Sequence, residues 1–258
     1  MKIIDSHAHY GYWPTMTKCE DMILKSMEKN RVNFTLFSFD GTEFREGRTK
    51  FTSQLEGSKK ALALCKKHQN KLGMLVWYRP HLEKNPAELE DFIKKHLDFI
   101  HGLKFHPYLS RMRISDQRNY PYFEIARKFN FPILVHTATD NYSKLKYIVK
   151  AAKEFPDIIF VAAHCVLESN HMEIISAMKE CPNLYADTAW VNMEFIQVIK
   201  QNNLMDRIMF GTDNPIDGYK TLDQEIYQNY FNNQIKLNKS DFEKLMYKNA
   251  KKVYKINL

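Results

Sequence analysis

Cysteine, glycine and proline are all scarce in this chain. Its 258 residues include four cysteines, eight glycines and nine prolines. So little glycine and proline excludes collagen-like and low-complexity classes. The cysteines, Cys19, Cys65, Cys165 and Cys181, lie far apart and form no C-x-x-C pair. We therefore expect reduced thiols and no disulfide framework.

Long hydrophobic runs are also lacking. The N-terminal sequence MKIIDSHAHYGYW turns polar at Asp5, so it contains no apolar segment of signal-peptide length. No other stretch of the sequence is long and apolar enough to cross a bilayer. We therefore expect a cytoplasmic protein that makes no membrane contact.

Arginine is uncommon among the basic residues. It accounts for nine of the 38 lysine and arginine residues, and the net charge is +8. A positive charge of this size attracts phosphate groups. The lysines, however, are spread along the predicted helices, which indicates solvated helix faces, and no nucleic-acid-binding motif is present. We expect no nucleic-acid partner.

The chain does contain a regular alternation of short apolar runs and amphipathic stretches of helical period. This alternation is typical of βαβ units around a parallel sheet. The eight predicted strands are Lys2 to Ser6, Val32 to Phe39, Leu72 to Tyr78, Gly102 to Phe105, Ile133 to His136, Ile158 to Ala163, Leu184 to Asp187 and Ile208 to Gly211. Two helices follow, Leu222 to Phe231 and Phe242 to Tyr254, the second with Ser240 as N-cap. No linker interrupts the pattern, which predicts one domain over residues 1–258.

Polar residues recur where these strands end. They are His7 and His9, Lys104 and His106, His136, His164, and Asp213. In a closed barrel such strand ends meet at one mouth. In an open doubly wound sheet, the first and last strands would be too far apart to share an ion. The common chemistry therefore favours an α/β fold of the (β/α)8 TIM-barrel type, with extra C-terminal helices.

The first strand carries the pattern Asp5-Ser-His-Ala-His9. Because side chains alternate along an extended strand, Asp5, His7 and His9 are expected on one face. Neutral imidazole is a common Zn²⁺ ligand, and a nearby carboxylate can orient the ring. A histidine pair bonded only to the backbone is the alternative, and each later strand-end residue could singly be structural. Their equivalent positions favour a shared site.

Taken together, these motifs resemble the metal-dependent amidohydrolase superfamily, in the branch of amidohydrolase-2 proteins and aminocarboxymuconate-semialdehyde decarboxylase. The matching motifs are Asp5-Ser-His-Ala-His9, Gly102-Leu-Lys-Phe-His-Pro107, Pro132-Ile-Leu-Val-His-Thr137, Val161-Ala-Ala-His164, Met209-Phe-Gly-Thr-Asp-Asn-Pro215 and Tyr247-Lys-Asn-Ala250. The resemblance implies a distorted barrel that holds one divalent ion with His7, His9, His136 and Asp213, and has His164 beside the bound water. Zn²⁺ is the first expectation, with Mn²⁺, Fe²⁺, Co²⁺ and Ni²⁺ as alternatives. A second ion is less favoured.

Such a site suits the activation of water, because a bound divalent ion lowers the pKa of water from 15.7 to about 7 and polarises a carbonyl oxygen. The resemblance implies Asp213 as the proton acceptor in hydrolases and His164 in decarboxylases. We therefore predict a hydrolase that cleaves an amide, lactone or ester bond. A nonoxidative decarboxylase that uses the same site is one alternative, and a catalytically silent barrel with a binding role is another.

Four residues are candidates for substrate binding: Trp13, Arg79, Lys104 and His106. Lys104 could hold a substrate carboxylate as a cation, or bridge two ions if it is carboxylated, and His106 could instead cap the following loop. Further basic residues are predicted in loops at the mouth: Arg45, Arg48, Lys50, Arg111, Arg113 and Arg118. We expect a small, anionic substrate, and the resemblance implies a homodimer.

Overall fold

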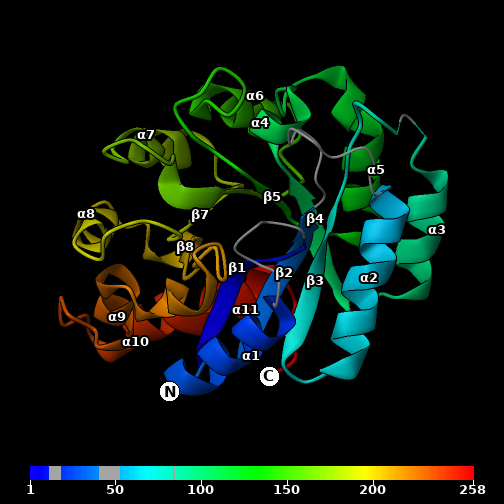
Figure 1. Cartoon of the computed structure of the whole chain (residues 1–258). Helices are drawn as coiled ribbons and strands as arrows, with labels where there is room; N and C mark the ends of the chain where they lie inside the picture. Colours follow the sequence, from blue (N-terminus) through cyan, green and yellow to red (C-terminus); the bar gives the residue numbers. More distant parts are fainter. Residues whose placement is uncertain (12–18, 41–52, 84) are drawn as a thin grey trace.

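A computed structural model describes residues 1–11, 19–40, 53–83 and 85–258, so the predicted roles of Trp13, Arg45, Arg48 and Lys50 fall outside the described residues. Within these ranges eight parallel strands form one sheet in the order β1 to β8 (Figure 1). The strands are β1 (Ile4–Gly11), β2 (Phe34–Asp40), β3 (Leu72–Trp77), β4 (Ile100–Phe105), β5 (Ile133–Val135), β6 (Phe160–Ala162), β7 (Leu184–Asp187) and β8 (Ile208–Met209). The predicted α/β barrel is confirmed.

The first strand and the segment after the last strand meet, which closes the sheet. The backbone N–H of Ser6 donates to the carbonyl of Phe210 at 3.0 Å, and that of His9 donates to the carbonyl of Asn214 at 2.8 Å. Ala8 forms a parallel bridge with Asn214. Residues at the two ends of the sequence therefore share one barrel mouth.

The strand bounds differ from the sequence prediction mainly at β1. This strand runs to Gly11, beyond the predicted end at Ser6, because its carboxyl half pairs with both β2 and the segment after β8. Its register against β2 shifts between Asp5 and Ala8. The histidines therefore lie within the strand and not after it.

Helices alternate with the strands and surround the barrel (Figure 1). They are α1 (Cys19–Asn30), α2 (Gln54–Lys67), α3 (Ala87–Lys95), α4 (Pro107–Ser110), α5 (Tyr120–Phe129), α6 (Leu145–Glu154), α7 (Glu173–Glu180), α8 (Phe195–Gln201), α9 (Glu225–Phe231), α10 (Lys239–Glu243) and α11 (Asn249–Val253). Among the described residues, every helix is too short or too polar to serve as a bilayer-crossing segment.

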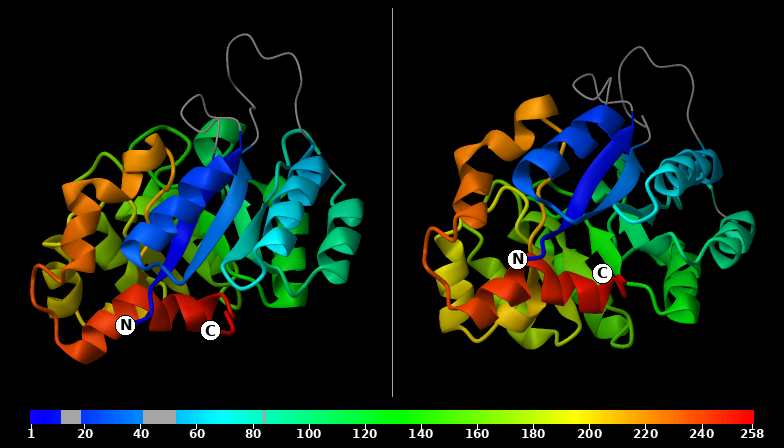
Figure 2. Two further views of the ribbon diagram at one scale, coloured as in Figure 1. Left: turned by 60° about the horizontal axis from the view of Figure 1, so that its bottom comes forward. Right: turned by 90° about the horizontal axis from the view of Figure 1, so that it is seen from below.

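Two apolar layers follow from the alternation of side chains along the strands. The large cluster packs the outer faces of the strands against the helices. A smaller cluster fills the barrel interior and includes Ile4, Leu36, Leu75, Leu134, Val161 and Met209, together with Ala250 and Val253 of α11. Figure 2 shows α11 across the end of the barrel where both termini lie. The polar mouth is thus at the opposite end, above an apolar floor.

The C-terminal helices depart from the prediction in detail. Ser240 was expected to be an N-cap, but it lies inside α10, and the cap is Asn238, whose side chain accepts from the backbone N–H of Asp241 at 2.9 Å. The helix predicted from Leu222 is a 3₁₀ helix over Gly218–Asp223 followed by α9. The helix predicted to Tyr254 contains a π-helical segment over Lys244–Lys248. That segment places the Leu245 carbonyl 2.9 Å from the backbone N–H of Phe210.

The buried amide of Asn249 ties α11 to the start of β8. Its Nδ2 donates to the carbonyls of Met205 at 2.7 Å and Ile208 at 2.8 Å. We expect Asn249→Ala to lower the free energy of unfolding by about 2 kcal/mol, because both carbonyls lose a donor inside the protein. Urea denaturation measures this effect, with the exposed Asn232→Ala as the control. Equal midpoints for the two variants would contradict it.

Candidate metal centre

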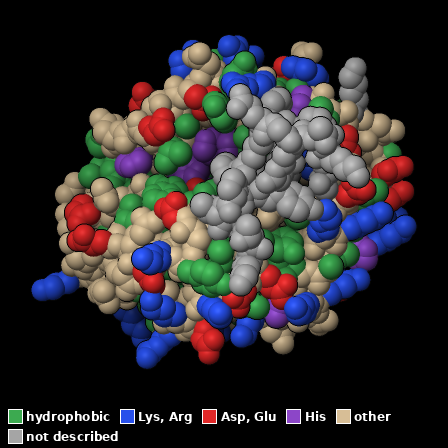
Figure 3. Space-filling view, in the orientation of Figure 1, with side chains coloured by type: hydrophobic (Ala, Val, Ile, Leu, Met, Phe, Trp, Pro, Cys, Tyr) green, Lys and Arg blue, Asp and Glu red, His purple; other side chains and the backbone are tan. Residues whose placement is uncertain are grey.

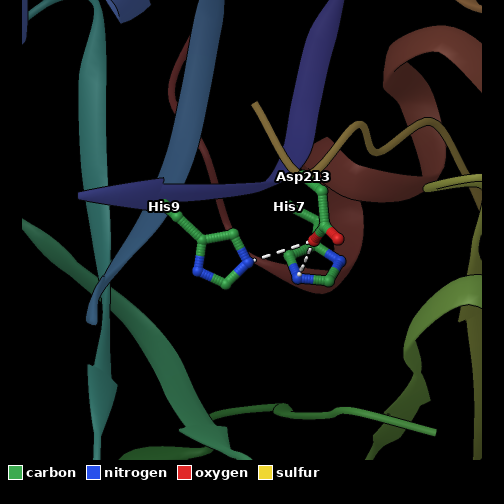
Figure 4. A group of neighbouring side chains, drawn as sticks. All are labelled: His7, His9 and Asp213. Atoms are coloured by element: carbon green, nitrogen blue, oxygen red, sulfur yellow. Dashed lines mark hydrogen bonds and ion pairs between the residues drawn. The ribbon is translucent and has the colours of Figure 1, made fainter. Parts of the chain in front are cut away.

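Two histidines of β1 and one aspartate after β8 converge at the mouth. Oδ1 of Asp213 lies 2.9 Å from Nε2 of His7 and 3.0 Å from Nε2 of His9 (Figure 4). One ligand atom from each residue lies within 4.8 Å of the other two, and all three side chains are buried. The structure therefore brings together three of the four predicted metal ligands.

Asp5 lies next to this group and bonds to the backbone of His7 and the side chain of Thr212. Its Oδ1 accepts from the backbone N–H of His7 at 3.2 Å, and its Oδ2 accepts from the hydroxyl of Thr212 at 2.5 Å. It therefore links β1 to the segment that carries Asp213. Burial is the main cause that raises the pKa of Asp5 to about 7.

A carboxylate that the sequence analysis did not single out orients the His7 ring. Oδ2 of Asp187, at the end of β7, lies 2.9 Å from Nδ1 of His7. Its Oδ1 accepts from the backbone N–H groups of His164 at 2.9 Å and Ala189 at 3.1 Å. Such a partner fixes which ring nitrogen is free to bind. Asp187 ends a predicted strand, so the same argument that selected Asp213 could have found it.

Trp190 is a second residue that the sequence analysis missed. Its indole N–H donates to Oδ2 of Asp213 at 2.9 Å, which leaves Oδ1 facing the histidines. The backbone is left-handed at His164, Trp190 and Asp213, with φ values of 67°, 62° and 61°. Non-glycine residues adopt this conformation at a cost, and such strain is concentrated at functional sites.

Three further histidines continue the group across β4 to β6. Nδ1 of His136 lies 3.1 Å from Nε2 of His164, whose own Nδ1 lies 3.2 Å from the carbonyl of Ala189. Because a carbonyl only accepts, Nδ1 of His164 carries the proton. The rings of His106 and His136 stack at 4.0 Å. Figure 3 shows histidine side chains gathered in a hollow of the face seen in Figure 1.

The structure places the other predicted site residues as follows. His136 contacts the ligand group only through His164 in the contacts found among the described residues. Nδ1 of His106 accepts from the backbone N–H of Leu109 at 3.4 Å, so it caps α4, as the alternative interpretation expected. Nζ of Lys104, fully buried, lies 2.8 Å from Nε2 of His7. Arg79 is buried beside Gly57 of α2.

The pKa shifts in the centre leave His7 protonated at neutral pH and leave His9 and His164 neutral. Burial and Lys104 lower the pKa of His7, but Asp213 and Asp187 outweigh them and raise it to about 9. Burial lowers the pKa values of His9 and His164 to about 4. Burial alone would raise the pKa of Asp213, yet His7 and His164 hold it well below its usual range. Asp213 is therefore ionised at neutral pH.

This donor set fits a divalent cation. With Nδ1 of His7 bonded to Asp187, the facing atoms are two imidazole nitrogens and a carboxylate oxygen, which are ordinary ligands of Zn²⁺ and Mn²⁺. Two imidazole nitrogens and a carboxylate oxygen lie this close only when protons or a cation lie between them, and Nε2 of His9 can donate one proton to Asp213. In the absence of an ion, the raised pKa of His7 indicates that its Nε2 also carries a proton towards Asp213.

Binding of an ion should therefore release a proton. Below about pH 9 His7 is protonated, and the ion must displace its Nε2 proton, whereas His9 is already neutral. At pH 7 we expect about one proton released per ion, and an affinity that rises about tenfold per pH unit up to pH 9. Calorimetric titration with Zn²⁺ or Mn²⁺ in two buffers of different ionisation enthalpy measures the release.

Asp187→Asn serves as the control, because it removes a charge that raises the pKa of His7 and should reduce the number of protons released. An affinity that stays constant from pH 7 to pH 9, without proton release, would show that the ion does not compete for Nε2 of His7.

Comparisons with known proteins place this geometry in a family. No curated protein matches the chain. Among solved structures, an uncharacterised TIM-barrel protein from Bordetella bronchiseptica is 17% identical, with a TM-score of 0.72 and 98% of each chain covered. A 5-carboxyvanillate decarboxylase from Novosphingobium aromaticivorans, with bound manganese, is 10% identical, with a TM-score of 0.72 and coverage of 98% of this chain and 97% of that chain.

A third structure is named as a probable 2-pyrone-4,6-dicarboxylic acid hydrolase from Acinetobacter baumannii. It is 12% identical, with a TM-score of 0.70, and the match covers 99% of this chain and 100% of that chain. At these identities the likeness shows the fold alone. The sequence profile described as Amidohydrolase matches residues 4–256, nearly the whole chain. This protein is therefore a member of the metal-dependent amidohydrolase family.

Proposed function

We propose that this protein is a metal-dependent hydrolase that adds water across an amide, lactone or ester bond of a small, carboxylate-bearing substrate. The observation that carries the proposal is the convergence of His7, His9 and Asp213 within hydrogen-bonding distance. A divalent ion held there lowers the pKa of a water molecule and polarises a carbonyl oxygen. His136 completes the proposed ligand set, and Zn²⁺ and Mn²⁺ are the first ions to test.

Two side chains could accept the proton of the attacking water. Asp213 is ionised, and its carboxylate is held in place by Trp190 and His9. His164 is neutral at pH 7, and its Nδ1 lies 3.9 Å from Oδ2 of Asp213. With Nδ1 protonated towards Ala189, the Nε2 lone pair of His164 faces Nδ1 of His136 and could take up a second proton in exchange for that hydrogen bond. In this proposal Asp213 takes the proton first and His164 is the alternative acceptor.

The positive charge of Lys104 favours an anionic substrate. Burial is the largest cause that lowers the pKa values of His106 and His136, and the charge of Lys104 lowers them further. The charge of Lys104 therefore acts across the mouth. We propose that Lys104 attracts the substrate carboxylate, with His106 beside it. Trp13 and Arg79 remain proposed substrate contacts.

The experiment begins with elemental analysis of the purified protein, followed by reloading with Zn²⁺ or Mn²⁺. The loaded enzyme is incubated with a panel of carboxylate-bearing lactones and amides in isotopically labelled water. A hydrolase transfers one labelled oxygen into the product. Absence of bound metal, or absence of product from the whole panel, would count against the proposal.

Decarboxylation is the second candidate, because a 5-carboxyvanillate decarboxylase shares this fold across nearly the whole chain. Proton transfer through His164 would suit that reaction equally well. Aromatic carboxylates belong in the same panel for this reason. Release of CO₂ without uptake of label would identify a carbon–carbon lyase and replace the hydrolase assignment.

A further inference from the structure

Three adjacent strands, β1 to β3, place unpartnered polar atoms side by side inside the barrel mouth. They are Nδ1 of His9, Oγ of Ser38 and Nε1 of Trp77, each buried and without a hydrogen-bond partner in the part of the chain that the structure describes. Their residues are 4%, 1% and 3% exposed. We name these three atoms the β1–β3 arc.

The sheet register places the three side chains on the same face. His9 is paired with Ser38, and Ser38 is paired with Leu75, which belongs to the interior cluster. Trp77 lies two residues beyond Leu75 on the same strand, so it also points inward. The rings of His9 and Trp77 lie 6.4 Å apart. The arc therefore lies directly above the apolar floor and beside the metal centre.

Six other inward polar side chains of the mouth do have hydrogen-bond partners among the described residues. Inward polar side chains with hydrogen-bond partners are His7, Lys104, His136, His164, Asp187 and Asp213. Burying a polar atom without a partner is unfavourable, so such atoms in a native structure require an explanation, and a bound group is one that supplies the missing partner. Three of them on the same face of neighbouring strands indicate a ligand site.

The arc presents hydrogen-bond donors in a fixed arrangement. The indole N–H of Trp77 only donates, and its ring is stacked on His106 at 5.6 Å with an interplanar angle of 10°. Nε2 of His9 faces Asp213, and the other nitrogen of the ring points away from it (Figure 4). When Nε2 binds an ion, Nδ1 carries the ring proton and donates as well. The hydroxyl of Ser38 supplies a third donor.

We propose that the β1–β3 arc is a subsite that binds a carboxylate group of the substrate. Several donors on one face of the sheet, with Asp213 bonded to the other nitrogen of the His9 ring, suit an anionic oxygen acceptor. The charge of Lys104, which acts on His9 and His106, adds to the attraction. Assigning the carboxylate to the substrate rests on the proposed function, whereas binding of a carboxylate by the arc does not.

The test uses the full-length, metal-loaded protein with benzoate as the probe and benzamide as its uncharged analogue. Calorimetry should show tighter binding of benzoate. Trp77→Phe keeps the ring against His106 but removes the donor, and Ser38→Ala removes the hydroxyl. We expect each variant to bind benzoate about tenfold more weakly at unchanged metal content, because one hydrogen bond to a charged group is lost.

Thr35→Val is the matched control. Thr35 lies on the same strand as Ser38, and its hydroxyl is likewise buried and unpartnered within the described residues, but it lies on the outer face of β2. Its benzoate affinity should equal that of the wild type. Wild-type affinity in both Ser38→Ala and Trp77→Phe would overturn the subsite.

The indole N–H resonance of Trp77 provides a second readout that needs no substrate. It is assigned by its loss in Trp77→Phe, and it should move downfield on addition of benzoate. A resonance that does not move while benzoate binds would overturn the proposal. If the arc binds benzoate and yet no substrate turns over, the subsite stands and the proposed function fails.

Discussion

Asp213→Ala is expected to lower turnover by at least about a thousandfold and to leave the purified protein without its ion. The carboxylate is ionised, contacts both His7 and His9, and is the proposed acceptor of the water proton. Its loss removes a proposed ligand and a proposed base together, which amounts to several kcal/mol of transition-state stabilisation. Elemental analysis and initial rates on the substrate found by the panel measure the two effects.

Asp217→Ala is the matched control, because Asp217 lies on the same segment but is exposed and accepts only from Gln224 among the described residues. It should retain both metal and turnover. Circular dichroism shows whether Asp213→Ala is folded. A folded Asp213→Ala protein with a full complement of metal and wild-type rates would remove Asp213 from the site.

His136→Ala should produce the next largest effect. The resemblance assigns His136 as a ligand, and its Nδ1 lies 3.1 Å from Nε2 of His164, which leaves its own Nε2 able to bind an ion. Loss of an outer-sphere partner already weakens metal affinity by about 10- to 100-fold. Loss of a ligand should therefore weaken it by at least about a hundredfold. Competition with a chelator of known affinity measures the change.

His96→Ala is the control for this substitution, because His96 follows α3 in the outer helix layer and packs on Phe92. If His136→Ala binds the ion as tightly as the wild type does, the ion is held by His7, His9 and Asp213 alone. His136 would then act through His164.

The barrel and most of the centre could be predicted from the sequence because strand ends leave a readable signal. An apolar run followed by His136, His164 or Asp213 marks both where the chain is buried and where it reaches the mouth. Asp187 carries the same signal and was missed because it was read only as the last residue of a strand. Trp190 gave no signal, since its position depends on a left-handed backbone that residue type does not reveal.

Local detail was less predictable for a related reason. Alternation along β1 was expected to bring Asp5 beside the His7 ring, but the shift in register between Asp5 and Ala8 interrupts that period, and Asp187 holds the ring instead. Ser240 is a residue type that often caps helices. The helix instead begins after Asn238, because the amide oxygen of Asn238 accepts from the backbone N–H of Asp241. In both cases another hydrogen-bonding side chain took the predicted role: Asp187, distant in the sequence from His7, and Asn238, two residues before Ser240.

The apolar floor determines how small molecules enter and leave. Ile4, Leu75 and Val161 fill the interior, and α11 covers the far end of the barrel. A reactant and the molecule made from it must therefore exchange through the same opening at the carboxyl ends of the strands. A product that leaves slowly would occupy that opening, and so act as a competitive inhibitor of the next turnover.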